Sequence, residues 1–334
     1  MKININKATQ LSIDFLIKLG LSDEESKLIT QNLIEAELTG KKTHGFVKLL
    51  SFKKSFDCKK FNADLFKIDM IDESLVSIYL DGHNKLGYGY IYKSLERAFE
   101  KIKNSKLVVV GIKNLKTTGY IGDYARIAAE NNLIFIGFNN SPSGLVPYGS
   151  RDALLGTNPI TVGIPTSDIP VILDMASSQI TWGDLLIAKN EQKSIKNNVA
   201  IDSDGHFTND PIKVMDGGGL LPFFGHKGSG LAFIVALLAG VLTDSHIESN
   251  RMNNIGAGSF YILIDPTLFR PIIDFKNDIK IIINELKGSS KAKGFTEIYF
   301  AGERSGRLRQ KQLLNGLVDI SDISLKKIKN FLKK

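Results

Sequence analysis

Residues 155–177 read LGTNPITVGIPTSDIPVILDMAS and contain two short apolar runs, Pro159 to Ile164 and Val171 to Asp174. Each run is bounded by Gly, Pro, Asn or Ser, a pattern typical of buried strands separated by turns. The runs Leu133 to Phe138 and Ser259 to Ile264 have the same character, so we expect two further strands there. The centre of the chain is therefore predicted to form a β-sheet.

Helical patterns surround this centre, and the clearest runs from Asp23 to Leu38. Its apolar residues recur at helical spacing, and Ser22 with Glu25 matches a capping box that opens the helix. The run Leu231 to Leu242 is too short to cross a bilayer and is interpreted as a buried core helix. Further expected elements are a strand at Val108 to Val110 and helices at Ile91 to Lys103, Asp123 to Glu130, Pro271 to Leu286 and Ser324 to Lys333. The predicted fold class is mixed α/β.

The composition indicates a folded protein of roughly two domains, because 334 residues exceed the prior of about 150 residues per domain. The chain is 43% hydrophobic and 23% charged, far from the composition of disordered chains. The single cysteine, Cys58, excludes a multi-cysteine zinc site and an intramolecular disulfide, so we expect no metal and a reducing compartment. Met1 to Gln10 lacks the apolar core of a signal peptide, and no run reaches the ~20 apolar residues of a membrane span. We therefore expect a cytoplasmic protein without a membrane partner.

The formal net charge of +8 raises the question of nucleic-acid binding. Nucleic-acid-binding proteins concentrate their lysines in a patch with interleaved aromatic residues or in a known module. Here the lysines are spread along the chain, so we expect no nucleic-acid partner. A basic surface instead raises the local concentration of an anionic substrate, and a small anion is the expected partner.

No G-x-G-x-x-G motif follows a predicted strand, so the standard dinucleotide-binding fingerprint is missing. Glycine-rich turns do occur at Gly82 to Gly89, Gly217 to Gly219 and Gly225 to Gly230. Each is weak evidence, because a glycine in a turn more often supplies a positive φ angle than a phosphate contact. Local patterns alone therefore do not reveal a nucleotide cofactor.

Several longer motifs occur in a specific order between Thr43 and Glu303. They are THGFV at 43–47, PYG at 147–149, LGTNP at 155–159, LDMAS at 173–177, DSDG at 202–205 with DP at 210–211, GHKGSGL at 225–231, IDP at 264–266 and GE at 302–303. Together they resemble the malate/L-lactate dehydrogenase type 2 family, which includes ureidoglycolate dehydrogenase, diketogulonate reductase and piperideine-2-carboxylate reductase. LGTNP and LDMAS are far more specific than any lone glycine pattern.

The resemblance implies a homodimer with an unusual, non-Rossmann α/β fold, and NAD or NADP as the cofactor in a cleft bordered by both chains. A helical N-terminal region would accompany a mixed-sheet cofactor domain. We expect residues 1–110 with 285–334 to form a discontinuous helical domain for dimerisation and substrate binding, and residues 111–284 to form the nicotinamide cofactor-binding domain. The implied activity is hydride transfer that interconverts a small 2-oxo acid and its 2-hydroxy acid.

His44 matches the residue that acts as acid and base in these enzymes. An imidazole can give a proton to a carbonyl oxygen as hydride arrives and recover it in reverse, although an isolated histidine is more often structural. Lys48 matches a position usually occupied by arginine and is expected to face the substrate carboxylate, with a solvated surface lysine as an equal alternative. The i, i+4 spacing would place both side chains on one side of a helix. Lysine keeps the charge but loses arginine's bidentate fork.

For the cofactor, the resemblance points to a set of residues spread over the motifs. They are Asn140, Thr157, Asn158, Asp174, Met175, Ala176, Lys227, Gly228, Gly302 and Glu303. A carboxylate such as Asp174 can hold ribose hydroxyls, while Lys227 beside glycines suits a pyrophosphate. The structural alternatives are a helix cap for Asp174 and a solvated turn for Lys227.

Three positions depart from the family pattern. Thr117 stands where relatives often carry a second histidine, Asp184 where lysine is frequent and Ala236 where glutamate is frequent. Thr117 remains a candidate in the catalytic site, but a hydroxyl donates a hydrogen bond without exchanging a proton near neutral pH. Either His44 suffices, or the substrate differs from malate and lactate, or activity is diminished.

Two alternatives therefore stay open beside the 2-oxo-acid reductase. Reduction of a cyclic imine carboxylate needs the same hydride geometry. A catalytically weak homologue with a binding role would bind the cofactor without turnover.

Overall fold

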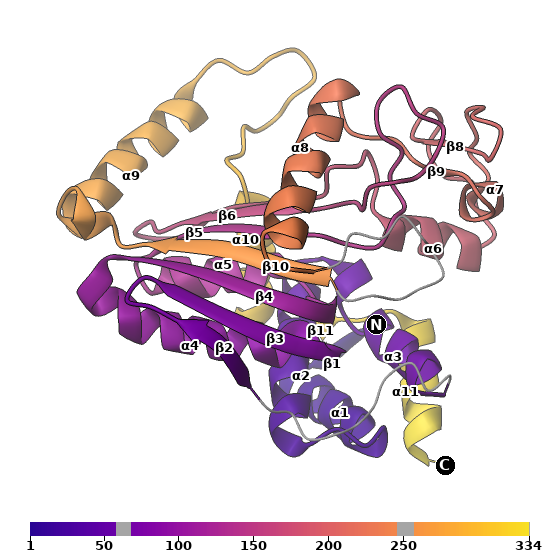
Figure 1. Ribbon diagram of the computed structural model, residues 1–334, viewed down its shortest axis with the longest axis horizontal. Helices are drawn as coiled ribbons and strands as arrows, with labels where there is room; N and C mark the ends of the chain where they lie inside the picture. Colours follow the sequence, from indigo (N-terminus) through magenta and orange to yellow (C-terminus); the bar gives the residue numbers. More distant parts are fainter. Residues whose placement is uncertain (58–67, 246–256, 334) are drawn as a thin grey trace.

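The computed structural model describes residues 1–57, 68–245 and 257–333, shown in Figure 1. Cys58, on which the expected reducing compartment rests, lies outside these ranges. Across the described residues, no helix combines the length and the apolar character that crossing a membrane requires.

A mixed seven-stranded sheet forms the centre, in the order β2-β3-β4-β10-β5-β6-β7. β3 and β4 run parallel and every other neighbouring pair is antiparallel, so the expected mixed α/β class is confirmed. The strands are β2 (Asp69–Glu73), β3 (Ser77–Leu86), β4 (Leu107–Thr117), β5 (Ile134–Asn139), β6 (Ile160–Ile164), β7 (Val171–Met175) and β10 (Ala257–Ile264). The strand predictions at residues 133–138, 159–164, 171–174 and 259–264 are confirmed to within two residues at each end.

Two helices cover one face of this sheet: α4 (Gly87–Ser105) and α5 (Ile121–Glu130). Both have an apolar side at helical spacing, and burying it against the sheet removes apolar surface from water. The core beneath them contains Val110 of β4, Phe135 of β5 and Tyr124 of α5, which are 0%, 1% and 0% exposed. This layer holds the ends of β4 and β7 in fixed positions.

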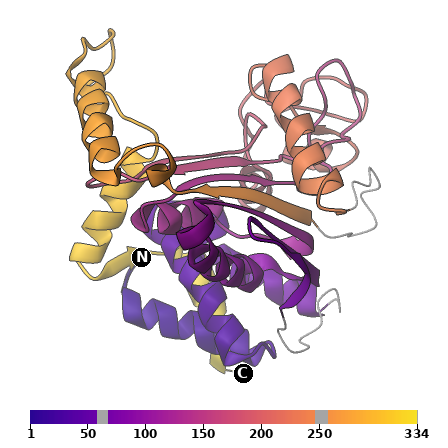
Figure 2. The ribbon, with the colours of Figure 1, turned by 60° about the vertical axis from the view of Figure 1, so that its left-hand side comes forward.

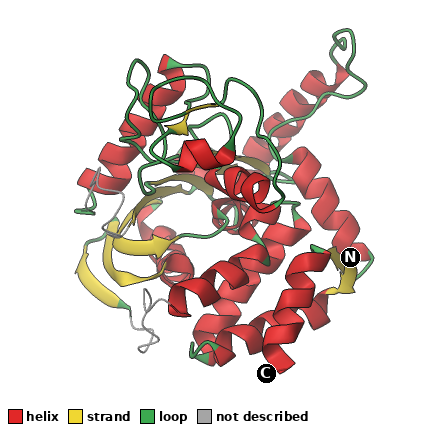
Figure 3. Ribbon diagram, turned by 90° about the vertical axis from the view of Figure 1, so that its right-hand side faces the viewer, coloured by secondary structure: helices red, strands yellow, loops and turns green. Residues whose placement is uncertain are grey.

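A second helical layer packs around the two termini. It consists of α1 (Ile5–Lys18), α2 (Asp23–Leu38), α3 (Val47–Asp57), α11 (Asp322–Lys333) and a small pair of strands, β1 (Lys2–Asn4) with β11 (Leu317–Asp319). Figure 3 shows these helices gathered near both chain ends, away from the loop-rich part of the molecule. α2 spans the predicted residues, and Ser22 Oγ accepts the Glu25 backbone N–H at 3.2 Å. This is the first half of the predicted capping box.

The loop-rich part contains several short elements. These elements are α6 (Trp182–Asn190), β8 (Ala200–Ile201), α7 (Pro211–Met215), β9 (Gly219–Leu220), α8 (His226–Ala236) and a π-helical turn, η2 (Leu237–Val241). Beyond β10 follow a 3-10 turn, η3 (Pro266–Leu268), and the helices α9 (Ile272–Gly288) and α10 (Glu303–Leu314). The expected domain boundary between residues 110 and 111 falls inside β4, and the domain division stays a prediction.

The prediction of a buried core helix at Leu231 to Leu242 is wrong. Phe233, Ile234 and Val241 are 54%, 48% and 60% exposed in the single chain. One side of this helical segment packs against β10 and β5, and the other side faces outward. A helix that is apolar on all sides is usually buried on all sides, but this one is buried on one side only in the single chain. Figures 1 and 2 show α8 and α9 rising at opposite ends of the sheet face that α4 and α5 leave uncovered.

Candidate active site

Two adjoining cavities lie where the residues before α3 meet the end of β7. The first, the His44 cavity, has a volume of about 300 Å³ and is lined by His44, Lys48 and Thr117 among others. The second, the Gly302 cavity, measures about 400 Å³ and lies against the segment before α10. The two share three lining residues, Lys41, Tyr120 and Asp174, and therefore adjoin at these side chains.

The turn that carries His44 is built by Glu37 at the end of α2. Its carboxylate accepts the Phe46 N–H at 2.8 Å and pairs with Lys42 Nζ at 3.0 Å. A Cβ at Gly45 would overlap this carboxylate, so glycine is required there for close approach. His44 ends a 3-10 turn, η1 (Lys42–His44), and Lys48 lies in α3.

The expectation that His44 and Lys48 share one α-helix is therefore wrong, because the chain leaves helical geometry at Gly45, with φ −88° and ψ −141°. Both side chains nevertheless line the same cavity. The four-residue spacing thus brings them together across a turn rather than along a helix. The candidate for proton transfer, His44, therefore still lies in the same cavity as the cation Lys48.

The imidazole of His44 is oriented by its neighbour: Nδ1 lies 3.0 Å from Thr43 Oγ1. No described residue makes a hydrogen bond to Nε2, which leaves that nitrogen available to a ligand in the cavity. Burial, reinforced by the positive charges of Lys48 and Lys41, lowers the pKa of His44 to about 3. The ring is therefore neutral in the free protein near pH 7.

Cations outnumber carboxylates in the His44 cavity. Lys41, Lys48 and Lys116 line it, whereas Asp174 is its one acidic lining residue among those described. Burial lowers the pKa of Lys48, and the described residues include no ion-pair partner for it. A buried cation without a counter-ion is costly, so this cavity is prepared for an anion. Thr117, at the end of β4, adds a hydroxyl to the wall.

Asp174 stands at the junction of the two cavities, at the end of β7. Its carboxylate accepts the Gly122 N–H in the first turn of α5 at 3.1 Å and the Thr161 hydroxyl at 2.9 Å. Burial raises the pKa of Asp174, and Lys41 and these two hydrogen bonds oppose that rise. Asp174 thus caps α5 from another element, and it also presents a carboxylate edge to both cavities.

The other cofactor candidates divide into two groups. Asn140, Thr157, Met175 and Ala176 line the His44 cavity, and Gly302 lines the second cavity. The structure does not bring Asn158, Lys227, Gly228 or Glu303 into the lining of either one.

Three of the four excluded candidates have structural partners. The Asn158 amide bridges the Ser141 N–H and the Ala232 carbonyl. Glu303 is 3% exposed and pairs with Lys287 and Arg307. A Cβ at Gly228 would collide with the Phe223 backbone, so this glycine allows close packing. Lys227 is exposed in the first turn of α8.

Of the two departures outside the His44 cavity, the structure explains one. Asp184 forms a capping box at the start of α6, with its carboxylate accepting the Thr181 N–H at 2.9 Å while Thr181 Oγ1 accepts the Asp184 N–H. An acid at this position stabilises the helix start, which lysine could not do. Ala236 is buried at the end of α8, and nothing in the structure explains why alanine stands there.

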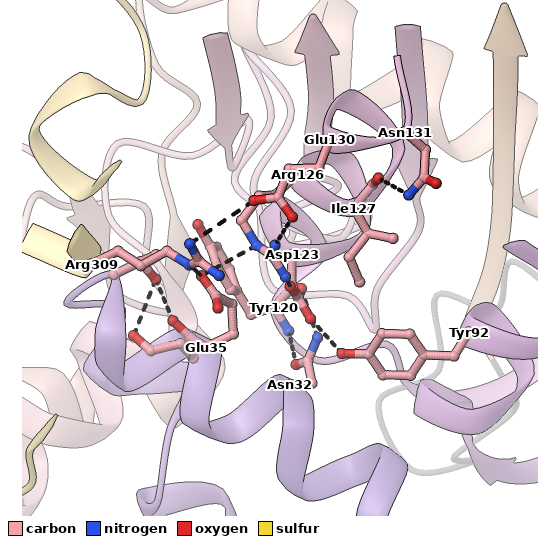
Figure 4. Close-up of polar contacts among 12 residues, drawn as sticks. Asn32, Glu35, Tyr92, Tyr120, Asp123, Arg126, Ile127, Glu130, Asn131 and Arg309 are labelled. Carbon is pink, nitrogen blue, oxygen red and sulfur yellow. Dashed lines mark hydrogen bonds and ion pairs between the residues drawn. The ribbon is translucent and has the colours of Figure 1, made fainter. Parts of the chain in front are cut away.

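Figure 4 shows a largely buried polar network whose members Arg126, Glu130 and Arg309 line the Gly302 cavity. Glu35 of α2 receives Arg309 of α10 at 2.7 Å and lies 3.3 Å from Arg126 of α5. Arg126 also pairs with Asp123 at 2.6 Å and with Glu130. Three helices distant in the sequence are thereby held around one wall of the cavity. Breaking a buried pair of this kind leaves an uncompensated charge.

Sequence reasoning missed Lys41, Tyr120 and Trp182, all of which line the His44 cavity. Lys41 comes just before the THG motif, so its closeness to His44 in the chain was a usable signal. Tyr120 is held by Asn32 of α2, whose amide bonds to the backbone N–H and carbonyl of Tyr120 at 2.7 and 3.0 Å. This contact spans 88 residues in the sequence and has no local signature.

The donor chemistry along the two cavities fits a nicotinamide dinucleotide. Lys41 supplies a cation at the junction, Asp174 a carboxylate, and Arg304 a guanidinium 5.5 Å from the centre of the Tyr299 ring in the Gly302 cavity. Gly302 has φ +85°, and a Cβ there would press on the Ile172 backbone, so the wall stays open beside Arg304. Charged groups for phosphates and hydroxyls and aromatic rings for bases are thus all present.

Known proteins resemble this chain over most of its length. A family model described as malate/L-lactate dehydrogenase matches residues 3–329. The malate dehydrogenase of Pyrococcus horikoshii is 33% identical over 90% of this chain and 87% of its own, and its solved structure superposes with a TM-score of 0.88 over 99% of this chain and 95% of that chain. The L-sulfolactate dehydrogenase of Methanocaldococcus jannaschii is 31% identical over 91% and 89% of the two chains. The Delta(1)-pyrroline-2-carboxylate/Delta(1)-piperideine-2-carboxylate reductase of Pseudomonas syringae pv. tomato is 29% identical over 74% of each.

Proposed function

We propose, from the chain's membership of the malate/L-lactate dehydrogenase family, that it interconverts a small anionic 2-oxo acid and its 2-hydroxy acid with NAD or NADP. The family establishes a dehydrogenase acting on CH–OH groups. The single observation that carries the finer proposal is the His44 cavity, where a neutral imidazole and Lys48, which has no ion-pair partner among the described residues, line one space. That pair matches the two demands of the reaction, proton transfer and carboxylate binding.

In the oxidation direction His44 Nε2 accepts the proton of the substrate hydroxyl, and in reduction the imidazolium returns it. Thr43 holds the ring through Nδ1 while this occurs. Lys48 binds the carboxylate as a point charge, without the fork that arginine would offer. Thr117 donates a hydrogen bond to the reacting oxygen or to the carboxylate. A nicotinamide held in the His44 cavity would supply the hydride acceptor for oxidation and the hydride donor for reduction.

Asn140, Thr157, Met175 and Ala176 would hold the nicotinamide end in the His44 cavity. Asp174 would bind ribose hydroxyls at the junction, and the adenosine end would occupy the Gly302 cavity beside Tyr299 and Arg304.

A substrate panel tests the proposal. The assay follows NADH and NADPH oxidation at 340 nm with 2-oxo acids carrying one or two acidic groups, diketo sugar acids and cyclic imine carboxylates. We expect turnover with at least one 2-oxo acid. If no compound is turned over while the cofactor still binds, the proposed enzymatic activity is contradicted and a homologue with a binding role is favoured.

Reduction of a cyclic imine carboxylate is the second candidate. Two observations favour it. Thr117 lacks the second titrating group that relatives often have. A relative named as a reductase of cyclic imine carboxylates is 29% identical over 74% of the chain. Lys48 would bind that carboxylate equally well. Turnover with the imines but with no 2-oxo acid would select this reading.

We also propose that the chain acts as a homodimer. α8 and α9 carry large apolar side chains that are exposed in the single chain, including Phe233 at 54% and Ile282 at 64%. Between them the uncovered face of the sheet presents half-buried residues such as Ile136 and Phe260. Contiguous exposed apolar surface of this kind usually marks an interface. A second copy of the chain is the partner that the family resemblance implies.

A further inference from the structure

We propose that Lys41 binds the pyrophosphate of the cofactor at the junction of the two cavities and thereby couples cofactor binding to the proton-donating state of His44. This inference rests on the proposed function, because it takes the nicotinamide to lie in the His44 cavity and the adenosine in the Gly302 cavity. It assigns to Lys41 the role that the motif pattern suggested for Lys227.

The position of Lys41 is the first reason. A dinucleotide that extends through both cavities must pass the residues common to them, which are Lys41, Tyr120 and Asp174. Its pyrophosphate lies near its middle, between the two riboses. Of the three shared residues Lys41 alone is a cation, and no ion pair joins it to a described residue. Lys227, in contrast, is exposed on α8 and lines neither cavity.

The local chain geometry is the second reason. The Lys41 backbone N–H bonds to the Ala36 carbonyl at 2.7 Å, and the positive φ of Gly40, +76°, turns the chain directly before it. The following residue, Lys42, is directed away to Glu37. Two adjacent lysines therefore have separate tasks: Lys42 stabilises the turn, and Lys41 faces the cavities.

The electrostatic consequence follows from the groups around His44. Lys41 before η1, Lys48 on α3, Lys116 on β4 and Asp174 on β7 all line its cavity. Burial, Lys48 and Lys41 together hold the pKa of His44 far below its ordinary value. A phosphate bound to Lys41, and a carboxylate bound to Lys48, each neutralise one of these positive charges. Both events raise the pKa of His44 and so favour the protonated ring that reduction requires.

Binding of ADP-ribose tests the first part without any turnover. Isothermal titration calorimetry would compare ADP-ribose, which contains the pyrophosphate, with adenosine, which does not. We expect Lys41→Met to weaken ADP-ribose binding roughly 10- to 100-fold and to leave adenosine binding unchanged. Lys41→Arg should restore most of the affinity. Lys27→Gln, which alters an exposed lysine paired with Asp23, serves as the control.

NMR titration of the histidine rings tests the second part, with the His44 signal assigned from its loss in His44→Gln. We expect ADP-ribose to raise the pKa of His44 in the wild-type protein. Lys41→Met should raise it without ligand and abolish the further response to ADP-ribose. The inference would be overturned if Lys41→Met left the ADP-ribose affinity unchanged. It would also be overturned if neither ADP-ribose nor Lys41→Met changed the pKa of His44. If the wild-type protein binds neither ADP-ribose nor NAD(P)H, the proposed function itself fails.

Discussion

At the scale of single residues, a substitution of Lys48 should affect substrate binding more than the chemical step. Lys48→Met should raise KM for a 2-oxo acid roughly 10- to 100-fold, because a charge-assisted contact to the carboxylate is lost. kcat should fall less, since His44 remains. Steady-state kinetics would measure both, with Lys48→Arg expected to retain a low KM. Lys54→Met, an exposed lysine of the same helix, is the matched control. A fall in kcat with KM unchanged would remove Lys48 from the carboxylate site.

Glu25, also at the residue scale, gives the protein a predictable pH dependence. Burial raises the pKa of its carboxyl to about 7, with Lys85 opposing the rise. The unfolded chain releases this proton near pH 4.5, whereas the folded chain keeps it to about pH 7. The free energy of unfolding therefore falls as pH rises through that interval, and the loss is complete above it.

Glu25→Gln removes this penalty and should stabilise the protein at pH 8 by roughly 1–3 kcal/mol, with little change at pH 4.5. Urea unfolding at a fixed protein concentration would measure the difference at both pH values. Glu24→Gln is the control, because the Glu24 side chain is 61% exposed. A Glu25→Gln variant that is less stable than the wild type at pH 8 is the result that contradicts the account.

The chemistry-bearing residues close to a motif could be predicted from the sequence, and those brought in by long-range contacts could not. His44, Lys48 and Thr117 all line one cavity, as the motif pattern suggested. Asn158 and Glu303 lie within specific motifs but are buried and have structural partners, so motif membership did not distinguish a binding role from a packing role. Tyr120 reaches the site through Asn32, which no local pattern indicates.

At the scale of elements, the turn between α2 and α3 depends on Gly45. A Cβ there would displace the Glu37 carboxylate, which holds the Phe46 N–H. Gly45→Ala should therefore cost about 1–3 kcal/mol of stability and reduce kcat by misplacing His44. Thermal unfolding and steady-state kinetics would measure the two effects. Gly288→Ala, where a Cβ would meet open space, should change neither. Wild-type behaviour of Gly45→Ala would show that the turn has room to relax.

Element types were more predictable than element environments. The apolar runs at β5, β6, β7 and β10 are short and bounded by turn residues, so their periodicity and length sufficed. The run at α8 is equally apolar, yet its outer side is exposed in the single chain. An apolar run predicts that a surface becomes buried. It does not predict whether the same chain or a second copy of the chain covers that surface.

At the scale of the whole molecule, the exposed apolar sides of α8 and α9 predict a dimer in solution. Sedimentation velocity across a range of concentrations should show a species of twice the chain mass. Phe233→Glu or Ile282→Glu would introduce a charge on these surfaces and should shift the protein towards monomer. Lys280→Glu, which changes charge on α9 without removing apolar area, is the control. A wild-type protein that sediments as a monomer at every concentration would exclude the proposed interface.

Proton transfer by His44 during hydride transfer can be tested by comparing two proteins. Wild-type and His44→Gln proteins would be assayed for reduction of the best 2-oxo acid of the panel, with NAD(P)H affinity measured in parallel. We expect His44→Gln to lower kcat roughly 10²- to 10⁴-fold with cofactor affinity nearly unchanged. A His44→Gln protein that turns over at the wild-type rate would contradict this expectation.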